Sequence, residues 1–210
     1  MSYKKEGLFM KYNFTARTFE LVFSHLAKQY YKEHPEDFDI KPILKKVKKE
    51  YSNILYRTPG IHNSLESNLI GASYLFAMAK KIPHMTPQKL DEIIDYGLHS
   101  PLLIRLHAHK NIFSNRTQNK MVKEAQKSMK STKEMDWTFT YQKGKDEFYL
   151  TYTRCGICKL AQKENVMEYL PCMCKMDYAK YEMVHAHLER TMTLAHHEAC
   201  CDFHVTKSSK

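Results

Sequence analysis

The sequence predicts an α+β fold in which a helical N-terminal half packs on a C-terminal antiparallel sheet of about four strands. Through the first 135 residues, apolar residues recur three and four positions apart, which is the spacing of one helix face. After Asp136, short runs alternate between aromatic or β-branched and polar residues, which is the spacing of a strand. Because helices and strands are segregated along the chain, we expect the sheet to be antiparallel.

Region 1–135 contains the predicted helices. Their expected spans are 15–34, 43–54, 64–81 and a segment that starts at Pro87. Thr15 and Thr86 are the expected N-caps of the first and fourth helices, and Pro35 ends the first. Residues 100–130 also have helical spacing but are more polar.

Region 136–210 is expected to contain the sheet and one cysteine-rich helical segment. Residues 137–141 and 148–153 form a predicted β-hairpin around a Lys-Gly-Lys-Asp turn. Residues 156–184 return to helical spacing, and 190–194 and 201–205 are the last two expected strands. We expect the two regions to form one compact domain, since 210 residues suffice to bury a single core.

Composition excludes several classes of protein. A hydrophobic fraction of 43% with only six Gly and seven Pro excludes disordered and collagen-like chains. No apolar run approaches the roughly 18–20 residues that span a bilayer. The basic N-terminus has no apolar segment behind it, so we expect neither a signal peptide nor membrane attachment but a cytoplasmic protein with reduced cysteines.

The formal net charge of +10 raises the question of a nucleic-acid partner. Most of the charge lies in residues 41–49 and 116–133, where basic residues alternate with apolar ones at helical spacing. A solvated helix face produces the same pattern. Since no aromatic-interleaved RNA motif or zinc-finger spacing accompanies the charge, we do not expect a nucleic-acid partner.

All six cysteines lie in the last quarter of the chain. They are Cys155, Cys158, Cys172, Cys174, Cys200 and Cys201. The Cys-Gly-Ile-Cys and Cys-Met-Cys pairs together resemble a four-thiolate zinc site, but the second pair has one intervening residue instead of two. Cys-x-x-Cys at a helix N-terminus is also typical of a redox pair, although the expected βαβ setting is missing.

Five motifs, in order, resemble the L-2-amino-thiazoline-4-carboxylic acid hydrolase family. They are Pro59-Gly60-Ile61-His62-Asn63, Cys155, Cys174-Lys175-Met176-Asp177, Arg190-Thr191-Met192-Thr193-Leu194-Ala195 and Cys201-Asp202-Phe203. The resemblance spans about residues 55–206 and is most specific in the last fifty. The chain departs from the family pattern at His197, where the family usually has Gly, and at His204, where it often has Arg. The Cys-Asp-Phe ending is also similar to vinyl-reductase-type ligand-binding domains, in which cysteines can hold zinc.

The resemblance implies hydrolysis of a small cyclic, amidine-like thioether that carries a carboxylate, at a carbon–nitrogen or carbon–sulfur bond. Such a reaction needs an activated water, a proton for the leaving group and a cation for the carboxylate. The implied catalytic residues are Cys174 and Asp177. The implied substrate contacts are Arg190, Thr193 and Asn63. No organic cofactor is implied, and the oligomeric state is left open.

The cysteines allow three interpretations. Cys155, Cys174 and Cys201 would bind one zinc ion with an open position for water, or Cys174 alone would attack the substrate as a thiolate. Alternatively, the thiols pack as small apolar side chains. The rival function from another class is a small-molecule-binding or sensing domain with a structural zinc.

The other candidate residues also have structural alternatives. Asp177 is a metal ligand, a general base or an ordinary surface carboxylate of a helix. Arg190 either holds a substrate carboxylate bidentately or forms a salt bridge with Asp202 on the neighbouring strand. Asn63 would cap the helix that begins after it.

Overall fold

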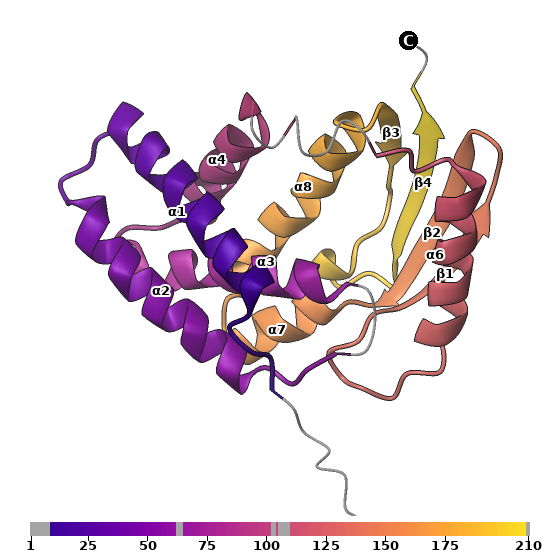
Figure 1. The fold of residues 1–210 in the computed structure, drawn as a ribbon, viewed down its shortest axis with the longest axis horizontal. Helices are drawn as coiled ribbons and strands as arrows, with labels where there is room; N and C mark the ends of the chain where they lie inside the picture. Colours follow the sequence, from indigo (N-terminus) through magenta and orange to yellow (C-terminus); the bar gives the residue numbers. More distant parts are fainter. Residues whose placement is uncertain (1–8, 62–64, 102–103, 105–109, 209–210) are drawn as a thin grey trace, which may run out of the picture.

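The structure is a computed structural model that describes residues 9–61, 65–101, 104 and 110–208. Within these residues it contains seven α-helices and one four-stranded antiparallel sheet, which confirms the predicted α+β class. Four N-terminal helices gather on one side of the molecule, and the sheet lies on the other (Figure 1). Helices α7 and α8 lie between these two parts.

The four N-terminal helices begin and end close to the predicted positions. They are α1 (Phe14–Glu33), α2 (Ile40–Arg57), α3 (Glu66–Lys81) and α4 (Pro87–Leu98). The expected cap of α4 is confirmed, because the Thr86 side chain accepts a hydrogen bond from the backbone N–H of Lys89. The expected cap of α1 is wrong. Asn13, whose side chain accepts from the Ala16 N–H, caps this helix instead of Thr15.

Helix α3 forms the centre of the helical half. Eleven consecutive residues, from 69 to 79, are buried, so this helix is covered on all sides. Tyr51 of α2 and Tyr74 of α3 are fully buried and meet edge to face, with ring centroids 5.2 Å apart. Burial of this aromatic core against α3 stabilises the helical half.

Helix α6 (Asn115–Ser128) covers only part of the expected helical stretch 100–130, some of which lies outside the described residues. Ser114 caps it by accepting from the Thr117 N–H. The helix packs on the first strand, where the Ser128 hydroxyl bonds both the N–H and the carbonyl of Phe139. The polar stretch 116–133 therefore includes a sheet-covering helix.

The sheet has the strand order β1-β2-β4-β3 and is antiparallel throughout. Its strands are β1 (Thr138–Lys143), β2 (Glu147–Arg154), β3 (Ala186–Glu189) and β4 (Cys201–Lys207). Aromatic and aliphatic side chains alternate with polar ones along each strand, so one face packs on the helices and the other is polar. In the β2–β4 register Tyr152 pairs with Cys201, which places both on the helix-covered face.

The predicted strand 190–194 is wrong. The strand lies earlier, at Ala186–Glu189, and a loop that includes the 3-10 turn Leu194–His196 follows it. The Asp202 carboxylate accepts hydrogen bonds from the backbone N–H groups of Thr191 and Met192. These bonds replace the ladder partners of a strand, because short polar side chains compete with the sheet for backbone donors.

The two halves are joined by α7 (Gly156–Glu164) and α8 (Leu170–Glu182), with the 3-10 turn Met167–Tyr169 between them. Helix α7 packs on α3, and α8 packs on α4 and β3. The nearly buried Glu164 at the end of α7 pairs with Arg57 of α2 and with Lys80 of α3, with the Lys80 Nζ 2.9 Å from Glu164 Oε2. This ion-pair network ties three helices together.

Candidate functional site

Cys174 and Asp177 lie on the face of α8 that looks toward the loop between β3 and β4. Because the segment is helical, residues three apart share a face, as the sequence predicts. Both side chains are half-buried. Two residues of the loop, Arg190 and Thr193, reach this face and contact the pair.

Arg190 links the loop to α8 through three kinds of contact. Its Nη1 lies 3.3 Å from Asp177 Oδ2, and its Nη2 donates to the Cys174 carbonyl at 3.1 Å. The guanidinium also lies over the rings of Tyr178 and Phe203, about 5 Å from each centroid. The expected alternative of a salt bridge to Asp202 is wrong, because Asp202 bonds the backbone of the loop instead.

Thr193 and Cys201 complete the contacts of the loop. The Thr193 hydroxyl donates to Cys174 Sγ at 3.7 Å and also accepts from the Ala195 N–H, which caps the 3-10 turn. Cys201 Sγ accepts from the Leu194 N–H at 3.3 Å. Hydrogen bonds therefore connect four of the sequence-predicted residues: Cys174, Asp177, Arg190 and Thr193. Cys201 joins them through the backbone of Leu194, the residue after Thr193.

Burial controls the proton affinity of the site. It raises the pKa of Asp177, and the nearby cations of Lys180 and Arg190 only partly oppose it. Burial also raises the pKa of Cys174 to about 12, against the lowering effect of the Thr193 hydrogen bond. Cys174 therefore stays a thiol at neutral pH, and Asp177 holds its proton to a higher pH than an ordinary aspartate does.

Cys155 lies at the N-cap of α7, directly after β2. Its negative charge, when present, raises the pKa of both Cys174 and Cys201, so the three sulfur atoms are within electrostatic range of each other. Yet among residues 9–61, 65–101, 104 and 110–208 no group of three His, Cys, Asp or Glu side chains is arranged to hold a metal ion. The geometry of the described side chains gives no support to zinc.

Two tyrosines that the sequence did not single out belong to the same neighbourhood. Burial raises the pKa of Tyr152 and of Tyr181, and the charge of Asp177 adds to the effect on both. Their rings flank Phe203, at centroid distances of 5.5 Å and 6.3 Å. The alternation of residues in β2 predicts that Tyr152 faces the helices, but the sequence does not predict that Tyr152 pairs with Cys201.

Asn63 lies outside the described residues, so its expected roles as helix cap and substrate contact have no structural test.

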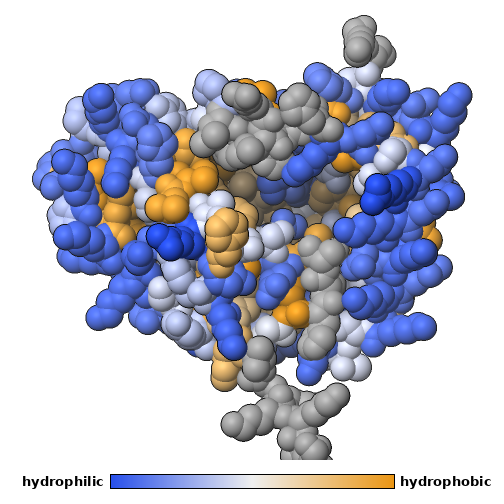
Figure 2. Space-filling view, in the orientation of Figure 1, coloured by the Kyte–Doolittle hydropathy of each residue, from blue (hydrophilic) through white to orange (hydrophobic). Residues whose placement is uncertain are grey.

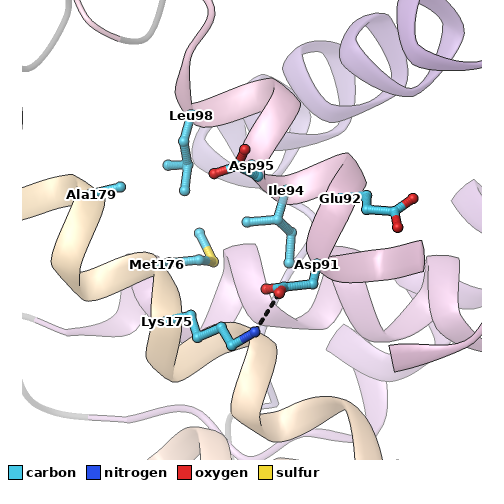
Figure 3. A pocket seen from close by; sticks show the side chains of 8 residues that line it. All are labelled: Asp91, Glu92, Ile94, Asp95, Leu98, Lys175, Met176 and Ala179. Atoms are coloured by element: carbon cyan, nitrogen blue, oxygen red, sulfur yellow. Dashed lines mark hydrogen bonds and ion pairs between the residues drawn. The ribbon is translucent and has the colours of Figure 1, made fainter. Parts of the chain in front are cut away.

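A separate shallow groove lies on the opposite face of α8, against α4 (Figure 3). It has a volume of about 260 Å³. Its lining residues are Asp91, Glu92, Ile94, Asp95, Leu98, Lys175, Met176 and Ala179. Lys175 spans it with a 2.5 Å ion pair to Asp91. Since Cys174 and Asp177 point away from this face, the groove is a helix–helix contact and not part of the candidate site.

Together these features define an α+β protein with a carboxylate, a thiol, a hydroxyl and a guanidinium joined between one helix and one sheet loop. Residues 64–205 match the family model described as L-2-amino-thiazoline-4-carboxylic acid hydrolase, and the chain belongs to that family. The matched region includes Cys155 and the motifs of Cys174–Asp177, Arg190–Ala195 and Cys201–Phe203, whereas Pro59–Asn63 lies just before it.

Other comparisons add little. No curated protein matches the chain. Among solved structures, the chain is similar to the crystal structure of the Fe(II) unliganded H-NOX protein from K. algicida, at 13% identity and a TM-score of 0.37. That alignment covers 91% of this chain and 97% of the other, but a likeness of this size carries no argument. None of the described helices is both long and apolar enough to cross a membrane.

Proposed function

We propose that the protein is a hydrolase that opens a small cyclic, amidine-like substrate of the 2-amino-thiazoline-4-carboxylate type at the site formed by Cys174, Asp177, Arg190 and Thr193. Membership of the family, which is named for this hydrolysis, supports the proposal. The observation that carries it is that separate family motifs, from α8 and from the loop after β3, meet in one set of contacts.

Asp177 is the proposed proton carrier. Water attacks the ring carbon that lies between sulfur and nitrogen, and Asp177 accepts a proton from that water. The same carboxyl then returns the proton to the ring atom that leaves. Its raised pKa suits both steps, because a carboxyl that titrates closer to neutral pH can both take and give a proton.

Arg190 and Thr193 are the proposed contacts of the substrate carboxylate. The two hydrogen bonds of Arg190 to Asp177 and to the Cys174 carbonyl use two of the five N–H groups of a guanidinium. The remaining donors suit a carboxylate, which accepts hydrogen bonds in the plane of the fork.

Cys174 is the second proposed catalytic residue. With a pKa of about 12, its thiol attacks only after losing its proton to a neighbouring base, and Asp177 is the base that lies on the same helix face. Without that proton transfer, Cys174 only lines the site and accepts the hydrogen bond of Thr193.

The experiment offers 2-amino-thiazoline-4-carboxylate to the purified protein and identifies the product by NMR. Opening of the carbon–sulfur bond releases a thiol, whereas opening of the ring carbon–nitrogen bond releases an amine, so the product names the broken bond. We expect Asp177→Asn to lower turnover by about a hundredfold or more, the usual loss for a general base, while the melting curve stays cooperative.

The exposed Asp95 on α4 supplies the control variant Asp95→Asn, which should match the wild type. Cys174→Ser decides between the two roles of the thiol. If Cys174 is the nucleophile, this variant should lose as much turnover as Asp177→Asn. If Cys174 only lines the site, the loss should be smaller. Tight binding of the compound by the wild type without turnover would overturn the hydrolase proposal in favour of a small-molecule-binding domain.

A further inference from the structure

Cys155 and Cys158 are paired across the first turn of α7. Cys155 is the N-cap, and Cys158 lies three residues later, so both sulfur atoms stand at the N-terminus of one helix. Both cysteines are free, and the neighbouring Cys158 side chain raises the pKa of Cys155. Cys155 is half-buried, whereas Cys158 is buried. Cys155 is thus the less enclosed of the two cysteines.

The chain around the pair is held in place. Gly156 is packed so closely under the Met135 carbonyl and the Trp137 ring that a Cβ there would collide with the carbonyl oxygen. The helix starts without a gap, since the Lys159 N–H bonds the Cys155 carbonyl at 3.2 Å. Cysteines three apart at such a helix start are within the Cα separation of about 4.4–6.8 Å that a disulfide requires.

We propose that Cys155 and Cys158 form a reversible disulfide by exchange with low-molecular-weight disulfides, which makes the start of α7 a two-electron redox site. The half-buried Cys155 attacks one sulfur of the external disulfide, forms a mixed disulfide and releases the first external thiol. Cys158 then attacks the Cys155 sulfur, closes the internal bond and releases the second. The two protein thiols lose two electrons and two protons, and the external disulfide gains them.

The electrostatics set the rate of this exchange. The neighbouring Cys158 side chain, together with burial, raises the pKa of Cys155, so the Cys155 thiol stays protonated at neutral pH. Since the thiolate is the nucleophile, the exchange should speed up as the pH rises.

The test incubates the whole protein with glutathione disulfide, alkylates the remaining thiols and digests the product with trypsin. Cleavage after Arg154 and after Lys159 yields one short peptide that contains both Cys155 and Cys158. The other four cysteines fall into two separate peptides. We expect the first peptide to lose two hydrogens and to escape alkylation, and dithiothreitol to reverse this.

Two variants test the order of attack. Cys158→Ser should stop at a mixed disulfide and gain one glutathionyl group on Cys155, whereas Cys155→Ser should form neither product in that peptide. Cys200→Ser, which changes a cysteine outside the pair, should behave as the wild type.

The proposal is overturned if the wild-type peptide keeps both thiols, or if Cys155 is instead crosslinked to the peptide of Cys174 or Cys201. Because the readout is covalent mass and not turnover, a failed hydrolase assay leaves this test unaffected. The wild-type digest also decides the matter where a serine variant does not fold.

Discussion

At the scale of single residues, Arg190 has both a structural role and a proposed role in substrate binding, and both use the N–H donors of its guanidinium. Its side chain is only 6% exposed and is committed to Asp177, to the Cys174 carbonyl and to the ring of Phe203. The same guanidinium is the proposed cation for the substrate carboxylate. A lysine at this position keeps the charge but loses the planar fork and the stacking on the aromatic rings.

We therefore expect Arg190→Lys to lower the free energy of unfolding by about 1–3 kcal/mol, the usual cost of losing a buried charged hydrogen bond. It should also raise KM for the carboxylate substrate. Denaturant unfolding and steady-state kinetics measure the two effects, with Arg116→Lys on the exposed side of α6 as the control. An unchanged KM beside a lower stability would mean that Arg190 only positions Asp177.

At the scale of elements, the start of α7 depends on the missing side chain of Gly156. A methyl group there would meet the backbone carbonyl of Met135, which cannot move aside without shifting the turn that precedes β1. We expect Gly156→Ala to cost about 3 kcal/mol or more, at or beyond the upper end for overpacked sites.

The matched control is Gly97→Ala in α4. There the new Cβ would meet only the side chain of Leu26, with the flexible end Cδ1 nearest at 3.0 Å, and alanine favours the helix over glycine. Its effect should stay within about 1 kcal/mol. Equal melting temperatures for the two variants would contradict the close packing at α7.

The ion pairs around Glu164 make the helix contacts depend on pH. Burial alone would raise the pKa of Glu164, but hydrogen bonds and charges from Arg57 and Lys80 outweigh burial and lower it. A carboxyl with a lowered pKa in the folded state contributes stability above its unfolded pKa, near the ordinary value of 4.5, and loses it as the pH falls through the folded value.

Thermal melts between about pH 6 and pH 3 should therefore show a falling melting temperature that begins near the ordinary glutamate pKa. Glu164→Gln should flatten this dependence and lower the stability at neutral pH, because Arg57 and Lys80 lose their charged partner Glu164. Glu168→Gln, a change at an exposed neighbour, should keep the wild-type curve. A curve for Glu164→Gln as steep as the wild type would assign the acid sensitivity to other carboxylates.

The helices and the hairpin were predictable from the sequence because each carries a local signal. Thr86 before Pro87 marks a helix start, and the aromatic alternation of β2 marks a strand, and both depend on near neighbours only. The absence of a strand at 190–194 was not predictable, because Asp202, eleven residues beyond Thr191, accepts hydrogen bonds from the backbone N–H groups of that segment. Alternation alone cannot reveal such a distant competitor.

The candidate site was predictable to the same extent. The motif residues Cys174 and Asp177 share a helix face, which their spacing indicates directly. That Arg190 pairs with Asp177 rather than Asp202, and that Tyr152 and Tyr181 stand beside it, depends on how α8 lies on the sheet. Such relations between elements leave no trace in local spacing.

At the scale of the whole molecule, the two basic segments lie far apart. Residues 41–49 belong to α2 on the helical side, and most of 116–133 belongs to α6 over the sheet, at opposite ends of the view (Figure 1). Part of the positive charge is also neutralised by ion pairs within the protein, such as that of Lys48 with Glu20. The surface over α6 is strongly hydrophilic, but no single stripe joins it to α2 on this face (Figure 2).

We therefore expect binding to duplex DNA to be weak at about 50 mM salt and to vanish by about 200 mM, as purely electrostatic binding does. Fluorescence anisotropy with a labelled duplex measures it. A complex that survives the higher salt would point to a nucleic-acid partner and against the small-molecule assignment.

The loop after β3 contacts both candidate catalytic residues of α8, Asp177 and Cys174, through a separate side chain for each. Arg190 lowers the proton affinity of Asp177, and Thr193 lowers that of Cys174, although burial outweighs both effects. If a ligand displaced this loop, Asp177 and Cys174 would lose these hydrogen-bonding partners together. The pKa of Asp177 therefore depends on the position of the loop that follows β3, and a change in that pKa on ligand binding, followed by NMR, would report displacement of the loop.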